Sequence, residues 1–352
     1  MEGEFSMEAK RYRVVQWATG NIGTKSLRAV IEHPRFDLVG LYVSAPDKVG
    51  KDAGALCGAA PTGIIATSSL ADIVALKADC VLYMRQGTDP DELCALLEAG
   101  TNIVTTRGDF HHPRAMDPAL RERVEAACAR GNSSIYSTGS SPGFITEALA
   151  IPLLSLARRH DCLTIDEYAD MSSRDSPDMI FKIMGFGVPM GEFDQGKVDY
   201  VKHDFAASLG QLADAIGLPC DSFDATGEMA AARNDHHIAA GLIAAGSVGA
   251  MRITVTGRRA GKPVVRFRAN WYCTDDIAED WGLRASGWKV LTEGDTPLEV
   301  AITFPVAPED YAAFTPGLTG HRAVNAVIAV CEAPAGIRTT TDLPQIMAQF
   351  GG

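Results

Sequence analysis

The sequence has no excess of positive charge and no long apolar run. Its 32 lysines and arginines are outnumbered by 44 aspartates and glutamates, which leaves a net charge of −12 at pH 7. A polyanion such as nucleic acid or an anionic membrane surface repels a chain of this charge. No unbroken apolar stretch reaches the roughly 18 residues that a membrane span requires. These absences argue against nucleic acid and membrane as partners and favour a small molecule.

Cysteine patterns that build metal centres or disulfide frameworks are also missing. The 8 cysteines are scattered along the chain without a C-x-x-C pair or a Cys/His cluster. Isolated thiols of this kind are typical of buried positions in the reducing cytoplasm. The sequence therefore predicts a cytoplasmic protein without a metal site. The polar segment 1–9 has the character of a leader with an internal start at Met7, and we exclude it from the fold.

Short apolar strands alternating with helical segments dominate the first part of the chain. The strands are predicted at residues 13–17, 38–43, 63–67, 80–84, 102–106 and 134–137, and the alternation is typical of an α/β domain with one parallel sheet. Beyond Gly143 a helix is predicted over residues 144–159, and longer alternating strands of a largely antiparallel sheet follow. We therefore predict an N-terminal Rossmann domain over residues 10–143, completed by about 317–352, and a C-terminal α+β substrate domain over 144–316.

The turn after the first predicted strand carries the motif A-x-G-x-x-G, from Ala18 to Gly23. Alanine takes the place of the first glycine of the dinucleotide-binding fingerprint. Gly20 lets the backbone approach a pyrophosphate, Gly23 lets the next helix pack closely, and the free N–H groups of the helix start face the anion. A tight turn without a ligand is the alternative. The βαβ context favours dinucleotide binding by Ala18, Thr19, Gly20, Asn21, Ile22 and Gly23.

The end of the second predicted strand bears on the choice of dinucleotide. An acidic residue there would bind the ribose 2′-hydroxyl of NAD, but the chain has S-A-P-D-K at residues 44–48. A hydroxyl at Ser44 followed by Lys48 and Lys51 suits a 2′-phosphate better. The alternative is that both lysines are solvated surface charges. We expect NADP as the preferred cofactor, and NAD is the open alternative.

Further loops follow the other strands of the predicted sheet. Ligands of open parallel sheets bind outside the carboxyl ends of the strands, where these loops begin. Ser140, Ser141 and Phe144 lie where a substrate would enter, although S-P-G at 141–143 also fits a plain turn into the next helix. We expect the loops to frame the nicotinamide through Arg85, Gln86, Thr106, Arg107 and Thr138.

Several stretches resemble a known superfamily. V-G-K-D-A-G at 49–54, S-S-L-A-D at 68–72 and T-T-R-G at 105–108 resemble the N-terminal domain of dihydrodipicolinate reductase. T-G-S-S-P-G-F at 138–144, the segment 271–281 and H-R-A-V-N-A at 321–326 are more similar to the branch with 2,4-diaminopentanoate dehydrogenase and the NAD(P)-dependent amine dehydrogenases. The resemblance implies reductive amination of a ketone or aldehyde with ammonia, the reverse deamination, and a homodimer formed through the substrate domain.

The resemblance also implies a catalytic acidic residue in a loop of the Rossmann domain, and Asp109 takes this place as anchor and general base. A cap, or an ion pair with Arg107 or Arg114, is the alternative role for Asp109. Residues 167–174, E-Y-A-D-M-S-S-R, replace the histidine-rich signature of dihydrodipicolinate reductase. A carbonyl or imine reductase and a non-catalytic nucleotide-binding protein stay open as other functions. The expected substrate contacts are Ser140, Ser141, Phe144, Tyr168 and Met171, and Asn325 joins the cofactor contacts.

Overall fold

The computed structural model describes residues 10–350 and divides into two compact units. Unit 1 comprises the chain up to Ser140 together with the part from Pro316 onward, and unit 2 comprises Ser141–Thr315. The chain therefore leaves the first unit, builds the second and returns. The leader expected at residues 1–9 lies outside the described residues.

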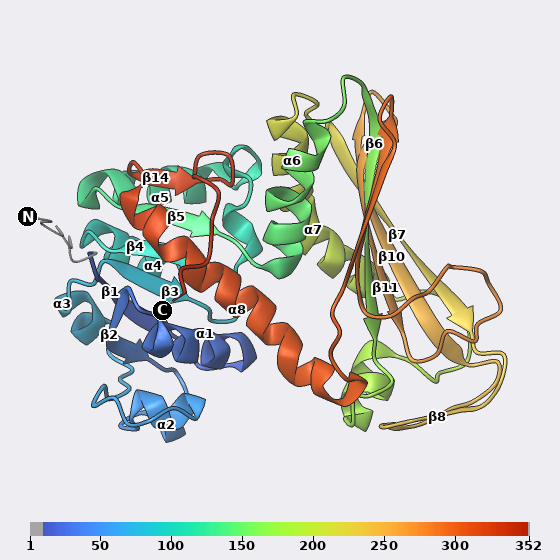
Figure 1. Cartoon of the computed structure of the whole chain (residues 1–352), viewed down its shortest axis with the longest axis horizontal. Coiled ribbons are helices and arrows are strands. Elements are labelled where there is room, and N and C mark those ends of the chain that lie inside the picture. The colour runs from blue at the N-terminus through green and yellow to red at the C-terminus, as the bar shows by residue number, and fades with distance from the viewer. Residues whose placement is uncertain (1–9, 351–352) are drawn as a thin grey trace, which may run out of the picture. The chain divides into compact units, whose positions relative to one another are not determined.

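Unit 1 contains a six-stranded sheet in which every pair is parallel. The strand order is β14-β5-β4-β3-β1-β2. From β1 the chain first adds β2 on one side and then adds β3, β4, β5 and β14 on the other, as in a doubly wound nucleotide-binding sheet. This confirms the predicted Rossmann architecture (Figure 1). The strands are β1 (Tyr12–Trp17), β2 (Phe36–Tyr42), β3 (Cys80–Tyr83), β4 (Asn102–Thr105), β5 (Ser134–Ser137) and β14 (Gly336–Arg338).

The sixth strand is not the one that the sequence predicted. Residues 63–67 form no strand of the sheet, and their pairing is limited to isolated bridges from Ile65 to Asp52 and from Thr67 to Tyr42. Asp52 accepts the N–H groups of Thr62 and Gly63 and holds this segment as a surface loop, with Ile65 55% exposed. The sixth strand of the sheet is instead β14, which pairs with β5.

Helices cover both faces of this sheet because successive residues of each strand point to opposite sides. Val14 packs in one cluster with residues of α1 (Asn21–Glu32) and α8 (Pro308–Glu332), whereas Val15 packs in another with α3 (Leu70–Ala75), α4 (Pro90–Glu98) and α5 (Pro118–Gly131). The cap residues Ser69, Asp89 and Asp117 accept N–H groups at the starts of α3, α4 and α5. The smaller helical elements are η1 (Pro46–Lys48), α2 (Ala53–Cys57), η2 (Gly108–Phe110) and η3 (Pro113–Ala115).

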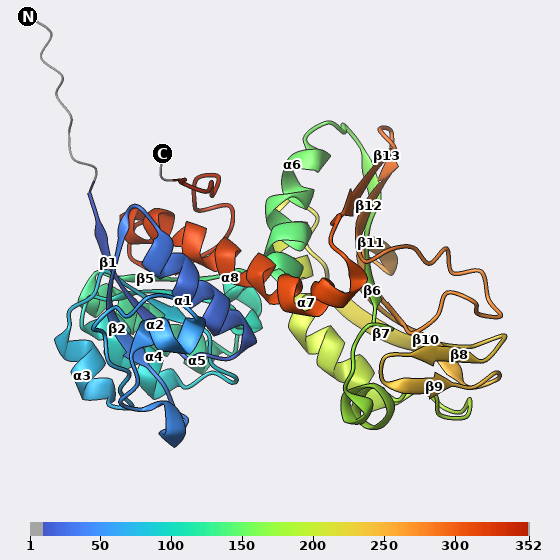
Figure 2. The same ribbon diagram turned by 60° about the horizontal axis from the view of Figure 1, so that its bottom comes forward.

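Unit 2 is built on a second six-stranded sheet of order β13-β12-β6-β11-β10-β7. Only β6 and β11 pair in parallel, and the other pairs are antiparallel, so the expectation of a largely antiparallel sheet is correct. Phe205 of α7 (Gln195–Ala215) stacks on Phe267 of β11, which places this helix on one face of the sheet (Figure 2). The strands are β6 (His160–Asp170), β7 (Ser222–Ala231), β10 (Val248–Arg259), β11 (Lys262–Tyr272), β12 (Gly287–Gly294) and β13 (Leu298–Thr303), with the hairpin β8 (His236–Ile238) and β9 (Gly241–Ile243).

The helix predicted over residues 144–159 is shorter than expected. The structure has a kinked segment, η4 (Ser140–Ala148), followed by α6 (Ala150–Leu154) and then a turn. The backbone is non-helical at Ser141, Pro142 and Gly143, because proline and glycine both disfavour the helical conformation. The last helical element is η5 (Asp178–Met184). No helix within residues 10–350 has the length and hydrophobicity needed to cross a membrane.

Candidate active site

The turn from β1 into α1 has the geometry that an anionic ligand requires. Ala18 adopts a φ of 74°, the left-handed conformation that glycine usually provides. A Cβ on Gly23 would lie 2.3 Å from the Ala18 carbonyl oxygen, whereas a Cβ on Gly20 would meet nothing within 4 Å. Helix α1 begins at Asn21 without a side-chain cap. This uncapped helix start beside open space fits a dinucleotide pyrophosphate.

Lys48 lies beside the same turn, although it is distant in sequence. Its Nζ donates to the Thr19 carbonyl oxygen at 2.9 Å and lies 3.1 Å from Thr19 Oγ1. The ammonium therefore adds positive charge directly at the fingerprint turn. Ser44 is exposed just after β2. No carboxylate occupies that strand end, because the residues that follow are alanine and proline.

The loop after β3 is tied to the start of α4. Arg85 Nη1 donates to Glu92 Oε2 at 2.7 Å, and the Tyr83 hydroxyl donates to the same oxygen at 2.7 Å. Burial and this hydrogen bond raise the pKa of Tyr83 above its usual value. Arg85 is thus held as a structural partner of Glu92, while Gln86 is exposed at the carboxyl end of the strand.

Asp109 lies in η2, directly after β4. Its Oδ2 accepts the Thr88 hydroxyl at 2.5 Å and lies 3.9 Å from Arg107 Nε. The N-cap of η2 is Arg107, without a side-chain cap hydrogen bond, so Asp109 does not cap this helix. With its side chain 24% exposed, the carboxylate is oriented yet accessible, as a group that exchanges protons with a ligand must be.

Two polar atoms near these loops lack hydrogen-bond partners. These atoms are Thr138 Oγ1, just after β5, and Arg107 Nε. Both are buried and have no hydrogen-bond partner among residues 10–350. Buried polar groups are rarely left unpaired, and such atoms at the carboxyl edge of a nucleotide-binding sheet fit a polar ligand. Thr106, between β4 and Arg107, is half-buried. The side chains at this edge, taken together with the turn after β1, fit a nicotinamide dinucleotide.

Other predicted residues of unit 1 lie on or beside α8. The Ser140 and Thr319 hydroxyl oxygens are 2.7 Å apart, so Ser140 connects the end of β5 to this helix. At Gly320 a Cβ would lie 3.2 Å from the Ile22 carbonyl oxygen, which shows how closely α8 approaches α1. Asn325 is half-buried five residues further along α8.

The predicted substrate residues of unit 2 have different environments. Tyr168 is 6% exposed and packs with Ala230, Ala250, Tyr272 and Ile277, which favours a packing role. Met171 packs against another apolar cluster. Phe144 and Ser141 lie on η4, where the Ser141 hydroxyl is buried without a hydrogen-bond partner in the described part of the chain.

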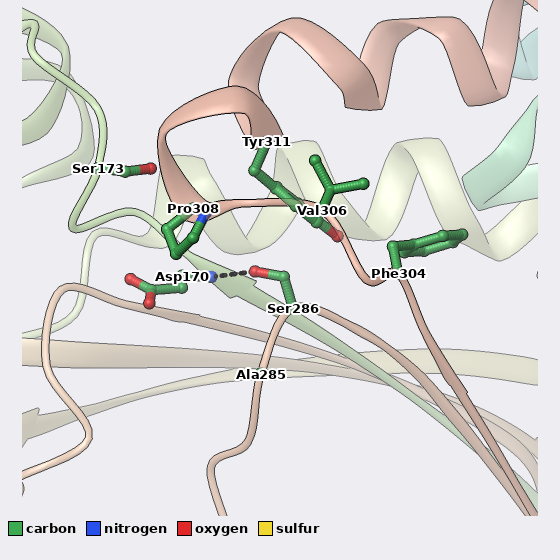
Figure 3. A pocket seen from close by; sticks show the side chains of 8 residues that line it. All are labelled: Asp170, Ser173, Ala285, Ser286, Phe304, Val306, Pro308 and Tyr311. Carbon is green, nitrogen blue, oxygen red and sulfur yellow. Dashed lines mark hydrogen bonds between the residues drawn. The ribbon is translucent and has the colours of Figure 1, made fainter.

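Unit 2 also contains a pocket that the sequence did not predict (Figure 3). The Asp170 N–H donates to Ser286 Oγ at 2.9 Å, and Asp170 Oδ1 accepts the Ser172 N–H at 2.8 Å. Burial raises the pKa of Tyr311 above its usual value. No sequence pattern connects these residues, because the sheet brings them together from three distant segments. The cavity of about 100 Å³ is lined by Asp170, Ser173, Ala285, Ser286, Phe304, Val306, Pro308 and Tyr311.

Comparisons with known proteins agree with this geometry. The chain is 28% identical over 343 residues to an amine dehydrogenase of Streptomyces virginiae, covering 94% of this chain and 95% of the relative. It is 26% identical to 2,4-diaminopentanoate dehydrogenase of Acetoanaerobium sticklandii over 44% of this chain and 42% of that one. The solved amine dehydrogenase of Mycobacterium smegmatis superposes with a TM-score of 0.73 at 18% identity, covering 96% and 97% of the two chains. No protein-family model matches the chain.

The parallel sheet and its match to a solved structure show a Rossmann-type nucleotide-binding fold, and the curated relatives place the chain among dehydrogenase-like proteins. Within that class, the relatives support the resemblance to the amine dehydrogenase branch of the dihydrodipicolinate reductase-like superfamily.

Proposed function

We propose that the protein is an NAD(P)-dependent amine dehydrogenase, which converts a ketone or aldehyde and ammonia to an amine and catalyses the reverse deamination. The observation that carries the proposal is the similarity to the Streptomyces virginiae amine dehydrogenase over 94% of the chain. The uncapped start of α1 beside Gly20 supports it, because a dinucleotide fits there. The nicotinamide supplies or accepts the hydride.

The residues at the carboxyl edge of unit 1 would hold the cofactor. The turn from Ala18 to Gly23 would bind the pyrophosphate, and Lys48 would add positive charge from its position on Thr19. Thr138 and Arg107 offer buried polar atoms without hydrogen-bond partners among residues 10–350, which suit the ribose or carboxamide. Gln86, Thr106 and Asn325 complete the proposed set, and Arg85 acts through its ion pair with Glu92.

Asp109 is the proposed acid/base residue. Its hydrogen bond from Thr88 holds one carboxylate oxygen in place, and the second oxygen is left to exchange a proton with the amine or carbinolamine. Loss of water from a carbinolamine requires such proton transfer. The substrate contacts proposed from the sequence are Ser140, Ser141, Phe144, Tyr168 and Met171, although the packing of Tyr168 within unit 2 favours a structural role for it.

NADP is the proposed preferred cofactor, because Ser44 leaves the end of β2 without a carboxylate that would repel a 2′-phosphate. A cytoplasmic location is supported by the cysteines, all eight of which are free thiols and six of which are buried. We also propose a homodimer, as the resemblance implies. Light scattering of the full chain tests this, and a monomer at micromolar concentration would contradict it.

The decisive experiment measures NADPH and NADH oxidation with a panel of ketones and aldehydes, each with and without concentrated ammonium at alkaline pH. Oxidation that requires ammonium supports the proposal. Oxidation without ammonium would make the protein a carbonyl reductase, and cofactor binding without any turnover would make it a non-catalytic nucleotide-binding protein.

A further inference from the structure

Two of the cysteines lie beside each other at the edge of unit 1 where the parallel strands begin. Cys80 is the first residue of β3, and Cys331 is the second-last residue of α8. Both side chains pack in the same apolar cluster. The Cys331 thiol donates to the Asp79 carbonyl oxygen at 3.6 Å, and this carbonyl belongs to the peptide group that joins Asp79 to Cys80. The fold therefore brings together two thiols that are far apart in the sequence.

Hydrogen bonds hold the end of α8 against the sheet. The Val330 carbonyl oxygen accepts the Ser134 hydroxyl of β5 at 2.7 Å. Glu332 Oε1 accepts the Tyr12 hydroxyl of β1 at 2.5 Å. Cys331 therefore lies between two residues that are hydrogen-bonded to strands of the sheet, and both bonds keep its sulfur atom beside the start of β3.

The two thiols differ in exposure, which gives each a different role in an oxidation. Cys80 is 0% exposed, whereas Cys331 is partly exposed. Burial and the neighbouring Cys331 thiol raise the pKa of Cys80 well above its usual value, so Cys80 forms little of the reactive thiolate. A small oxidant from the solvent therefore meets Cys331 first, and Cys80 is placed to react with the product.

From this arrangement we propose that hydrogen peroxide converts Cys80 and Cys331 into a reversible disulfide that joins the end of α8 to β3. The Cys331 thiolate attacks a peroxide oxygen, the O–O bond breaks, and the hydroxide that leaves takes up the proton that the thiol has lost. Cys331 is then a sulfenic acid. The Cys80 sulfur attacks the Cys331 sulfur, the S–S bond forms, the S–O bond breaks, and the oxygen leaves as water with the Cys80 proton.

The overall reaction oxidises two thiols to one disulfide and reduces one peroxide to two water molecules. Thiol–disulfide exchange with an excess of a reducing thiol reverses it, as is usual for disulfides that form in the cytoplasm. The inference goes beyond the proposed function and does not depend on it. The two cysteines lie where the strands of unit 1 begin, whereas the proposed dinucleotide contacts lie where the strands end.

The test treats the full chain with hydrogen peroxide under native conditions and counts its thiols after denaturation. We expect two of the eight thiols to be lost and to return with dithiothreitol. Mass spectrometry of an unreduced digest should show a cross-linked peptide pair that contains Cys80 and Cys331. Cys331→Ala should abolish this cross-link, and Cys80→Ala should leave a sulfenic acid at Cys331 that a dimedone reagent labels.

Cys220 provides the matched control, because it is the other partly exposed cysteine. Cys220→Ala should form the disulfide between Cys80 and Cys331 as the wild type does, and loss of the cross-link in this variant would overturn the inference. The wild-type digest keeps the inference testable if Cys80→Ala does not fold. An unchanged thiol count, a cross-link between two copies of the chain, or a sulfinic acid at Cys331 without a cross-link would each overturn it. All of these readouts are independent of turnover, so the amine dehydrogenase proposal stands or falls separately.

Discussion

The two glycines of the turn after β1 serve different physical purposes. Gly23 is required by the fold, because a Cβ there would collide with the Ala18 carbonyl oxygen at 2.3 Å. Gly20 is required only by a ligand, because its Cβ position is open. We expect Gly23→Ala to lower the free energy of unfolding by about 1–3 kcal/mol, measured by thermal denaturation.

Gly20→Asp should leave thermal stability near that of the wild type but abolish NADPH binding, since a carboxylate would lie beside the phosphates. Fluorescence titration with NADPH measures this, and Gly20→Ala serves as the uncharged control. Unchanged affinity in Gly20→Asp would disprove the assignment of this turn to the pyrophosphate.

Asp109→Asn tests the proposed proton transfer at a single atom. Asparagine still accepts the Thr88 hydroxyl but cannot take up a proton, so we expect kcat to fall by roughly 10²-fold or more with little change in NADPH affinity. The exposed Asp91, on α4, provides the control Asp91→Asn. Near-normal turnover in Asp109→Asn would reduce Asp109 to a structural partner of Thr88 and Arg107.

Ser44 tests the choice of cofactor. Ser44→Asp places a carboxylate at the exposed end of β2, where it would repel a 2′-phosphate and accept from a free 2′-hydroxyl. We expect the ratio of NADPH to NADH affinity to fall at least tenfold. Equal changes for both cofactors in a paired titration would refute the 2′-phosphate position.

Among whole elements, the nucleotide-binding turn was predictable and its distant partners were not. The motif at Ala18–Gly23 is local, and its glycines have local steric reasons. Strand β14 has only three residues, too few to show an alternation, and it forms because β5 offers an open edge. The pocket of Asp170, Ser286 and Tyr311 escaped prediction for the same reason, since its members meet only through long-range pairing and packing.

The parallel pair of β6 and β11 contains an ion pair between a buried carboxylate and a half-buried guanidinium. Arg268 Nη2 donates to Asp166 Oδ2 at 2.7 Å, and the Asp166 side chain is 3% exposed. Asp166→Ala would leave the half-buried guanidinium without its partner, and we expect it to lower the free energy of unfolding by about 1–3 kcal/mol in urea denaturation. The exposed pair of Arg258 and Asp224 is the control, and Asp224→Ala should cost at most about 1 kcal/mol. Equal losses of unfolding free energy in Asp166→Ala and Asp224→Ala would show that the burial of Asp166 does not strengthen its ion pair.

At the scale of the whole molecule, the two units should respond differently to the cofactor. A ligand present at 100 times its dissociation constant stabilises the unit that binds it by about 2.7 kcal/mol. With NADPH we expect the slowest amides of β1, β3 and β14 to exchange up to about 100-fold more slowly, whereas those of β10 and β11 should change little. Hydrogen exchange followed by mass spectrometry measures this, and equal protection of both units would contradict the assignment of the dinucleotide to unit 1.

The pairing of β14 with β5 also has a consequence for synthesis on the ribosome. Residues 141–315 emerge after the first five strands of unit 1 and before β14 and the part of α8 that belongs to unit 1, from Pro316 onward. Unit 2 can therefore complete its sheet while the nucleotide-binding sheet still has an open edge at β5 and one apolar face without α8. Until the last part of the chain is translated, this nascent intermediate exposes apolar surface that molecular chaperones would recognise.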